Sequence, residues 1–294
     1  MMNIAIIGLG EVGRIYAQAM VDAGLEIIGV CEPSLSPASN KIAEKLGLAI
    51  HNSNGPWLQS ADLVISAVTG QAALAAALAA FPFLRPQVLY ADFTTASPAD
   101  MRAAAKAADA SNLRFVDVAI MGGITLTGAK TTLLCAGHGA GDVAQILAPL
   151  GGKISVLSKG QAGDAVTLKL LRSLFTKGLE ALAVETLTLA ENVGLKAQLY
   201  ENLADIDATS LPEFLDMLVR THVLHADRRY HEVETAEAQL RAAGFQPCVT
   251  LCVKNLFDRS RKTVKNLDLP PDIPVTEALR LLIDSARLEH TRTT

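Results

Sequence analysis

A lysine set among leucines is the side chain of this 294-residue chain best suited to move a proton. Lys169 follows a glycine-containing segment and is flanked by Leu168, Leu170 and Leu171, in what the periodicity predicts to be the first turns of a long helix. Apolar surroundings lower the pKa of an ammonium group towards values at which it can exchange a proton near neutral pH. The alternative is a surface lysine whose stem lies along the helix and whose charge stays in water. Lys177, two turns later, is a weaker candidate for the same role.

A glycine pattern at the start of the chain is the second feature with chemical meaning. Residues 3–8 predict a short buried strand, and a helical pattern opens directly after the segment Gly8, Leu9, Gly10, Glu11, Val12, Gly13. Gly8 permits a tight turn, Gly10 lets the backbone approach a pyrophosphate, and Gly13 lets the helix pack against its strand. The N–H groups at the helix N-terminus would face the phosphates. This strand–turn–helix context predicts a dinucleotide site, and the alternative is an ordinary glycine turn.

An acidic residue at the end of the second predicted strand bears on which dinucleotide binds. Glu32 follows Gly8 by 24 residues, at the place where a carboxylate hydrogen-bonds the 2′-hydroxyl of the adenosine ribose and repels a 2′-phosphate. We therefore expect NAD in preference to NADP as the cofactor. A solvated acid at a strand end is the other interpretation, and Ser34, Ser36 and Lys41 could still accommodate a phosphate.

Short apolar runs alternate with helical patterns over the first half of the chain, which predicts a parallel, doubly wound sheet. The predicted strands are 3–8, 25–31, 48–50, 61–67, 88–92, 115–120 and 131–136. The predicted helices of this half run from Gly13 to about 24 and over 39–46, 72–80, 97–108 and 141–150. Loops at the carboxyl ends of parallel strands face the ligand. We therefore expect Thr69 and Thr94, with Thr95, to lie under the ribose or nicotinamide, although either site could instead cap the following helix.

Helical patterns alone fill the second half. They cover 164–193, predicted as one long buried helix, and then 198–204, 211–243, 248–264 and 275–289. We therefore expect an α/β fold in which residues 1–158 form an N-terminal Rossmann-type domain. Residues 159–294 would form an all-α C-terminal domain, with the ligand cleft between the two.

Composition and charge exclude several classes of protein. Hydrophobic residues make up 50% and aromatic residues 4% of the chain, so a core of Ala, Leu, Val and Ile is expected. A net charge of −4 offers no basic face for nucleic acid, and the apolar runs are too short to span a membrane. The start lacks a secretory pattern, so we expect a cytoplasmic protein. The cysteines at 31, 135, 248 and 252 lack paired metal-ligand spacing, which predicts buried, reduced thiols and no metal site.

Four segments carry a resemblance to a known family: Gly8–Gly13, Asp92–Pro98, Asp117–Gly123 and Gly163–Lys169. In this order they are similar to the cofactor fingerprint, the Asp-x-Ser-Thr segment, the glycine-pair substrate loop and the lysine segment of the β-hydroxyacid dehydrogenase superfamily. That superfamily includes 6-phosphogluconate and 3-hydroxyisobutyrate dehydrogenases. The resemblance implies hydride transfer between a nicotinamide and a small hydroxy acid or its keto or semialdehyde form, with Lys169 as acid/base. It also implies a homodimer with intertwined helical domains.

The chain departs from that family at three places. Met121 replaces the serine before Gly122 and Gly123, whose N–H groups could still bind an anion of the substrate. Ser173 stands where the family usually has asparagine, and we expect its hydroxyl to position the substrate. His231 lies at the place of a later lysine and is expected to line the cofactor site. These differences indicate a substrate other than those of the two named dehydrogenases.

Two other functions stay open on the sequence. An imine reductase-like enzyme shares the architecture but carries another residue at the lysine position, so Lys169 counts against it. A non-catalytic NAD(P)-binding sensor or scaffold would keep the cofactor site without the chemistry. Met121 and Ser173 leave that second alternative open.

Overall fold

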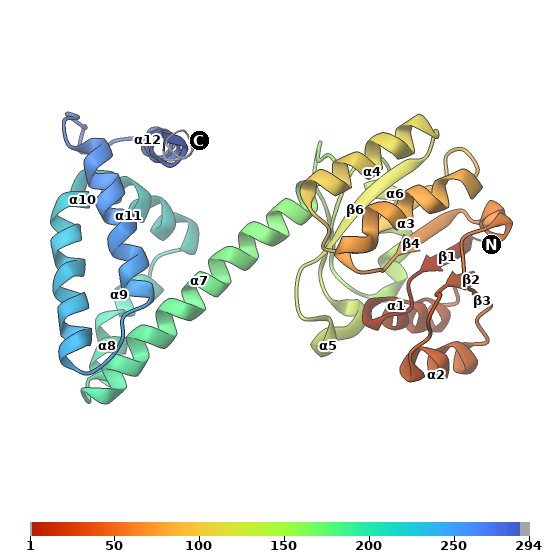
Figure 1. Ribbon diagram of the computed structural model, residues 1–294, viewed down its shortest axis with the longest axis horizontal. Helices are drawn as coiled ribbons and strands as arrows, with labels where there is room; N and C mark the ends of the chain where they lie inside the picture. Colours follow the sequence, from red (N-terminus) through yellow and green to blue (C-terminus); the bar gives the residue numbers. More distant parts are fainter. Residues whose placement is uncertain (1, 289–294) are drawn as a thin grey trace. The chain divides into compact units, whose positions relative to one another are not determined.

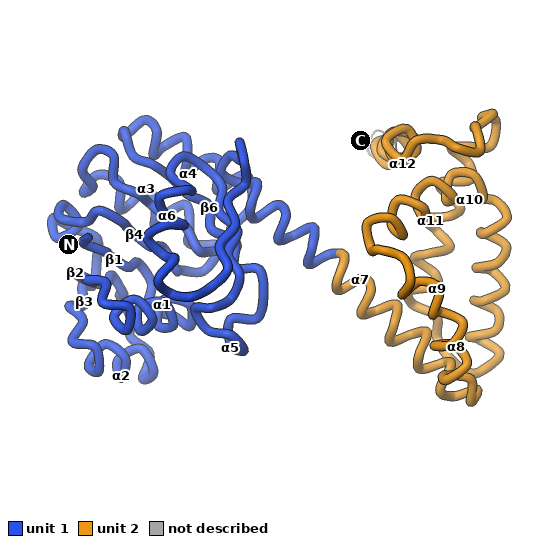
Figure 2. Tube along the Cα trace, turned by 180° about the vertical axis from the view of Figure 1, so that it is seen from behind, with its two compact units in different colours: residues 1–174 blue, residues 175–294 orange. Residues whose placement is uncertain are grey.

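The computed structural model describes residues 2–288, which form two compact units, one ending at Leu174 and one beginning at Phe175 (Figure 1; Figure 2). The division falls inside the long helix α7 (Asp164–Asn192). The domain boundary expected at residue 158 precedes this division and stays a prediction.

The N-terminal unit is built on one eight-stranded sheet. Its strands are β1 (Asn3–Ile7), β2 (Glu26–Cys31), β3 (Ile50–His51), β4 (Leu63–Ser66), β5 (Leu89–Asp92), β6 (Arg114–Ile120), β7 (Leu133–Ala136) and β8 (Ile154–Val156). They lie in the order β3-β2-β1-β4-β5-β6-β7-β8, and all neighbours are parallel except β6 and β7. The first six strands have the order of a Rossmann fold, which confirms the predicted fold class. The sequence did not predict β8, which lies at the edge of the sheet beside β7.

Helices cover both faces of this sheet (Figure 1). They are α1 (Glu11–Asp22), α2 (Pro37–Leu46), α3 (Ala73–Ala80), α4 (Pro98–Ala110), α5 (Ile124–Thr127) and α6 (Ala140–Leu147). The short 3₁₀ turns η1 (Pro56–Ser60), η2 (Gly70–Ala72), η3 (Phe81–Phe83), η4 (Gly128–Lys130) and η5 (Ala148–Leu150) lie in the connections. One face packs on α1 and α6, through Tyr16 and Val143 among others. The other packs on α3 and α4, where small residues such as Ala77 and Ala104 allow a close approach.

Local capping explains where α2 and α4 begin. Ser36 accepts a hydrogen bond from the N–H of Ser39 (3.1 Å), and Ser97 accepts one from the N–H of Asp100 (3.0 Å). Each cap is followed by a proline at the first helical position, where a missing N–H costs nothing. The cap predicted at Ser97 is therefore confirmed.

The C-terminal unit is helical, as predicted. Besides the later turns of α7, it contains α8 (Lys196–Asn202), α9 (Ala204–Asp207), α10 (Leu211–Ala242), α11 (Val249–Val264) and α12 (Val275–Leu288). The helices α10, α11 and α12 enclose a small core of Val223, Ile273 and Ala278. The single helix predicted over 211–243 bends at His225, whose φ of −122° and ψ of 15° are not helical. No proline or glycine marks this bend in the sequence. Glu289, the predicted end of the last helix, lies outside the described residues.

The Glu185 carboxylate of α7 holds the start of α11. It accepts hydrogen bonds from the N–H groups of Cys248 (2.6 Å), Val249 (3.0 Å) and Thr250 (2.8 Å), and from the Thr250 hydroxyl. Burial opposes ionisation, but these donors outweigh it and lower the pKa of Glu185 to about 2. This contact joins residues more than sixty positions apart, which local capping rules cannot foresee.

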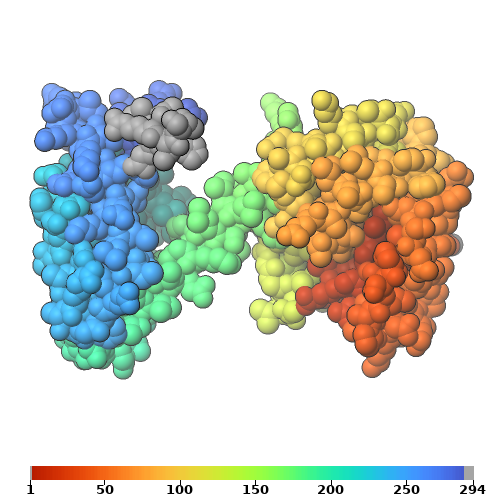
Figure 3. All heavy atoms as spheres, viewed as in Figure 1, coloured from red at the N-terminus to blue at the C-terminus, as the bar shows by residue number. Residues whose placement is uncertain are grey.

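Helix α7 is a single helix, as predicted, but the prediction that it is buried is wrong for the single chain. Eight of its apolar side chains are between 40% and 72% exposed: Leu168, Leu170, Leu171, Leu174, Phe175, Leu179, Leu182 and Val184. The green segment in Figure 3 follows this stretch. Apolar residues are distributed around most of the circumference of α7. The periodicity therefore did not identify which side of the helix is buried or what would cover it.

Two of the four cysteine predictions are also wrong. Cys31 and Cys135 are buried, whereas Cys248 and Cys252 are exposed because they lie at the start of α11, at the surface of the C-terminal unit. All four are free thiols. Within residues 2–288, the helices are each too short or too polar to cross a membrane.

Candidate active site

The glycine turn between β1 and α1 contains two glycines that the fold itself requires. Gly8 has a φ of +94°, and a Cβ there would lie 2.7 Å from the carbonyl oxygen of Ala67. A Cβ on Gly13 would lie 2.0 Å from the carbonyl oxygen of Gly8. Backbone atoms cannot move aside as side chains can. The absence of a Cβ at Gly8 and Gly13 therefore permits the close contact between β1, α1 and the loop after β4.

Gly10 differs from its neighbours. A Cβ there would meet nothing within 4 Å among the residues that the structure describes, and Gly10 is exposed. It is also the N-cap of α1, and within the described chain no side chain caps that helix. The fold thus gives no reason for a glycine at this position, whereas a ligand that approaches the backbone would.

The Glu32 carboxylate lies at the same turn. It accepts the N–H of Leu9 at 2.7 Å and that of Ser34 at 3.3 Å, so the acid expected to meet a ribose stands directly beside the glycine turn. On the other side of the turn, the Ser39 hydroxyl donates to the carbonyl oxygen of Leu9 (2.6 Å). The Arg14 side chain donates to the carbonyl oxygen of Gly10 (3.2 Å), a contact that sequence reasoning missed.

These features fit a dinucleotide. The helix N-terminus offers N–H groups to phosphates, the open position at Gly10 admits them, and a carboxylate stands where a ribose would lie. The predicted site residues from Gly8 to Gly13 and Glu32 therefore lie together at the carboxyl ends of β1 and β2, with Gly10 and Glu11 exposed and Gly8, Leu9 and Gly13 buried.

Lys169 lies in the second turn of α7, within the N-terminal unit. Its Nζ donates a hydrogen bond to the Thr95 hydroxyl at 2.7 Å. Partial burial lowers the pKa of Lys169, while the negative charge of Asp117 acts in the opposite direction. Lys169 is half-buried, and the threonine that its ammonium contacts is exposed. The catalytic role of Lys169 stays a prediction.

Of the two adjacent threonines after β5, it is Thr95 that contacts the lysine. Thr94 is 4% exposed, and its hydroxyl accepts the N–H of Ala96 (3.1 Å), which closes a turn within the loop. The cap of α4 is Ser97, so neither threonine fills the capping role left open by the sequence. Thr69 precedes η2 and is exposed at the end of β4. The cofactor roles of Thr69 and Thr94 stay predictions.

The substrate loop predicted at 121–123 follows β6. Met121 packs against Ala119, Ala136 and Ala165, the last of these in the first turn of α7. Gly122 and Gly123 are exposed, so their N–H groups are accessible to an anion. A serine at position 121 would offer a hydroxyl, whereas the methionine instead joins the loop to α7 through apolar contact.

Two buried aspartates near this site were not assigned a role from the sequence. Asp92 is the last residue of β5 and is 1% exposed. Asp117, which lies beside it on the neighbouring strand β6, is fully buried. Burial raises the pKa of Asp92 to about 6, although hydrogen bonds from Thr94 lower it; Asp117 raises it further. Burial also raises the pKa of Asp117. The signal available in the sequence was an aspartate in each of two consecutive predicted strands, Asp92 at the end of one and Asp117 in the middle of the next.

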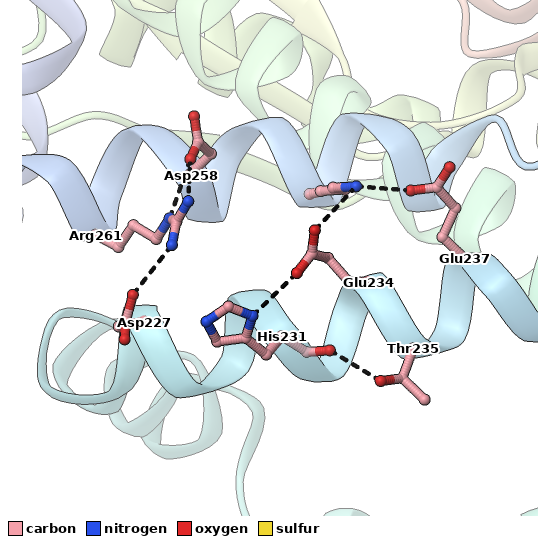
Figure 4. Close-up of polar contacts among 8 residues, drawn as sticks. Asp227, His231, Glu234, Thr235, Glu237, Asp258 and Arg261 are labelled. Atoms are coloured by element: carbon pink, nitrogen blue, oxygen red, sulfur yellow. Dashed lines mark hydrogen bonds and ion pairs between the residues drawn. The ribbon is translucent and has the colours of Figure 1, made fainter.

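Ser173 and His231 complete the predicted residues. Ser173 lies one turn after Lys169 on α7 and is half-buried. His231 belongs to α10 in the C-terminal unit, where its Nδ1 lies 3.0 Å from the Glu234 carboxylate and its side chain is 62% exposed (Figure 4). Glu234 and Glu237 in turn pair with Lys254 of α11. His231 is thus part of a charged surface between α10 and α11, and its place in a cofactor site stays a prediction.

Among residues 2–288, no three His, Cys, Asp or Glu side chains lie where they could hold one ion.

Two family models match the chain. One, described as the NAD binding domain of 6-phosphogluconate dehydrogenase, matches residues 3–158. The other, described as a domain of unknown function (DUF1932), matches residues 190–260. The first covers the whole β-sheet and the second the centre of the helical unit.

Individual proteins are similar to the chain over most of its length. An uncharacterized 28.5 kDa protein in the 7S RNA 5′ region of Methanothermus fervidus is 32% identical over 256 residues, 87% of this chain and 98% of that protein. A conserved protein of unknown function, whose structure is described as similar to 3-hydroxyacid dehydrogenases, is 31% identical with a TM-score of 0.63. That match covers 89% of this chain and 97% of the other. An imine reductase from Aspergillus terreus in complex with NADPH4 has a TM-score of 0.71 at 21% identity, over 90% and 95% of the two chains. At that identity the likeness concerns the fold alone.

Proposed function

Because the chain belongs to the family of the NAD-binding domain of 6-phosphogluconate dehydrogenase, we propose that it interconverts a small hydroxy acid and its keto or semialdehyde form, with Lys169 as general acid/base. Membership of that family makes the chain an NAD(P)-binding oxidoreductase of the hydroxyacid dehydrogenase type. The observation that supports the role of Lys169 is the contact between its ammonium and the Thr95 hydroxyl, in the loop that follows β5.

Lys169 suits the proton transfer that such a reaction needs. A bound nicotinamide supplies the acceptor or donor of a hydride. In the oxidative direction, Lys169 in its neutral form takes the proton of the substrate hydroxyl; in the reductive direction, its ammonium returns a proton to the carbonyl oxygen. Partial burial lowers the pKa of the amine, which makes its neutral form more accessible, and the hydrogen bond to the Thr95 hydroxyl orients Nζ.

The residues around Lys169 would position the substrate. The exposed N–H groups of Gly122 and Gly123 can receive a carboxylate, and Ser173 lies on the lysine's own helix, one turn later. Met121 offers an apolar surface where the named dehydrogenases have a serine. This combination favours a hydroxy acid with an apolar group near its carboxylate.

Glu32 supports NAD as the preferred cofactor. Its carboxylate stands beside the glycine turn, where a 2′-phosphate would meet a like charge. Of the side chains that could accommodate a phosphate instead, Ser36 is engaged as the cap of α2 and bonds to Ser39. Ser34 and Lys41 remain exposed beside it.

Helix α7 supports a homodimer. Eight apolar side chains exposed along one helix form a hydrophobic surface. Complete burial of such a side chain contributes roughly 1.5–3 kcal/mol, and because these are already partly buried, covering each would contribute part of that amount. A second copy of the chain is the partner that the family resemblance implies.

The experiment that tests the function is a fluorescence titration of the full chain with NADH and, separately, with NADPH. The proposal expects saturable binding of at least one, and tighter binding of NADH. Turnover is then measured by nicotinamide absorbance with a series of small hydroxy acids, beginning with 3-hydroxyisobutyrate. Binding of neither nucleotide would contradict the proposal. Cofactor binding with equal turnover in wild type and Lys169→Ala would remove the role of the lysine.

A further inference from the structure

Three buried polar side chains form a row across the centre of the sheet. Ser66, Asp92 and Asp117 are direct neighbours on β4, β5 and β6, and all three are at most 1% exposed. They lie on the face that α3 and α4 cover, above apolar packing in which Tyr90 stacks on Phe115 with ring centroids 5.8 Å apart. Two carboxylates side by side in such surroundings are unfavourable for folding unless other contacts offset the cost.

Asp117 holds the beginning of the helix that carries the lysine. Its Oδ2 accepts the N–H groups of Gly163 and Val166, both at 3.0 Å. Gly163 has a φ of +95°, and a Cβ there would lie 2.8 Å from the carbonyl oxygen of Pro98. The entry of α7 is therefore fixed between β6 and the first turn of α4, and Lys169 follows within one turn of Val166.

Asp92 holds the turn that carries the threonine. Its Oδ1 accepts the N–H of Thr94 at 2.8 Å, and the Thr94 hydroxyl accepts the N–H of Ala96. From the other side, a Cβ on Gly70 would lie 2.7 Å from the carbonyl oxygen of Thr95. The loop is therefore confined between β5 and the segment after β4, and the Thr95 hydroxyl points to Lys169.

We propose that Asp92 and Asp117 act as paired positioning residues, each holding one half of the Thr95–Lys169 contact. The catalytic meaning of this contact rests on the proposed function. The geometry of the contact, and the experiment that tests it, do not depend on turnover. Neither aspartate touches the reacting atoms. Asp92 acts through the backbone of Thr94, and Asp117 acts through the first turn of α7.

Asp117 also acts on Lys169 through its charge. Its remaining oxygen, Oδ1, is buried and has no hydrogen-bond partner among the described residues, so its charge is poorly screened. The titratable groups that interact with Asp117 are Asp92 on β5, Cys135 on β7, and Asp164 and Lys169 on α7. Of these, Lys169 is the one cation, and the carboxylate stabilises its charged form.

Competitive labelling of amines tests both the positioning role of the aspartates and the effect of the Asp117 charge on Lys169, and it needs no substrate. The full chain is treated with trace acetic anhydride across a range of pH, and modification of Lys169 is quantified by mass spectrometry. The midpoint of the pH dependence reports the pKa of Lys169, and the limiting rate reports how freely its neutral amine reacts. Asp109→Asn, an exposed aspartate of α4, is the matched control, and thermal unfolding checks that each variant is folded.

The first arm uses Asp117→Asn, which removes a negative charge beside Lys169. Because that charge stabilises the ammonium, the labelling midpoint should move to lower pH, while Asp109→Asn leaves it in place. A midpoint unchanged in Asp117→Asn would overturn the electrostatic half of the proposal.

The second arm uses Asp92→Ala and Thr95→Ala, and it stands even if Asp117→Asn does not fold. Each substitution should raise the limiting rate of Lys169 labelling roughly two- to tenfold, the range expected from loss of one hydrogen bond. The double variant should show no further increase, because both act on the same contact. Asp92→Asn, whose amide oxygen can still accept the N–H of Thr94, should stay near wild type. Full additivity, or an unchanged rate in Asp92→Ala, would overturn the positioning role of Asp92.

Discussion

Gly10 and Gly13 lie three residues apart in one turn, yet alanine should have opposite consequences at the two positions. In Gly13→Ala, the new Cβ would lie 2.0 Å from the carbonyl oxygen of Gly8. Alanine would otherwise gain about 1 kcal/mol of helix propensity at this position of α1. A contact of that length with backbone requires α1 to move from β1, and such overpacking costs about 1–3 kcal/mol or more. We therefore expect a net loss of stability, with Tm falling roughly 2–4 °C for each kcal/mol lost.

In Gly10→Ala, the Cβ would enter open space. Alanine lowers the entropy of the unfolded chain, worth roughly 0.4–1 kcal/mol, and is a poorer N-cap than glycine by a similar amount. The free energy of unfolding should therefore change by less than about 1 kcal/mol. Because the methyl group would occupy the approach to a pyrophosphate, the Kd for the cofactor should rise at least about tenfold, or about 1.4 kcal/mol.

Thermal unfolding and fluorescence titration with NADH and NADPH, performed on both variants and wild type, measure the two effects separately. Cofactor binding unchanged in Gly10→Ala would refute the assignment of that glycine to a ligand. A Gly13→Ala variant as stable as wild type would refute the packing argument.

Three further predictions concern other parts of the chain. Glu32→Ala should raise the affinity for NADPH relative to NADH by roughly tenfold in paired titrations, because a like charge facing the 2′-phosphate is removed. Glu185→Gln should destabilise the C-terminal unit by about 1–3 kcal/mol in thermal unfolding, because three N–H groups and a hydroxyl lose a charged acceptor. Since the folded-state pKa of Glu185 is depressed from 4.5 to about 2, its contribution is present above pH 4.5 and is lost as the pH falls towards 2, a dependence the glutamine variant should lack. Leu171→Asp with Leu174→Asp should shift the chain towards monomer in analytical ultracentrifugation, whereas Leu126→Asp, exposed on α5, should not.

Each of these predictions has a result that contradicts it. A nucleotide preference unchanged in Glu32→Ala would mean that the carboxylate does not face the ribose. Wild-type stability of Glu185→Gln across the acid range would mean that the cap of α11 contributes little. A sedimentation profile insensitive to the α7 substitutions would leave the homodimer without support.

The parts of the fold set by short-range patterns could be predicted from the sequence. Strand β1, the glycine turn and α1 follow from apolar periodicity and from the spacing of three glycines, and Ser97 followed by Pro98 marks the start of α4. Short-range patterns also predict the positions of Lys169 in the early turns of α7 and of Glu32 directly after β2.

Features that depend on distant residues could not be predicted. The choice of Thr95 over Thr94 as the partner of Lys169 depends on how Asp92 closes its turn. The exposure of α7 depends on what covers it, and a periodic pattern does not identify the partner. No proline or glycine at His225 indicates in the sequence that α10 bends there. Strand β8 was not predicted because it forms by pairing with β7 at the edge of the sheet, and its own residues do not reveal that partner.

The central claim is that Lys169 moves a proton in a nicotinamide-dependent reaction. The most direct test compares turnover and cofactor Kd in wild type and Lys169→Ala, with Lys106→Ala, an exposed lysine of α4, as the control. General acid/base catalysis typically contributes 10²–10⁴-fold, so turnover in Lys169→Ala should fall by about that factor while the cofactor Kd and the Lys106→Ala variant stay near wild type. Turnover in Lys169→Ala equal to that of wild type, with the cofactor still bound, would contradict the account.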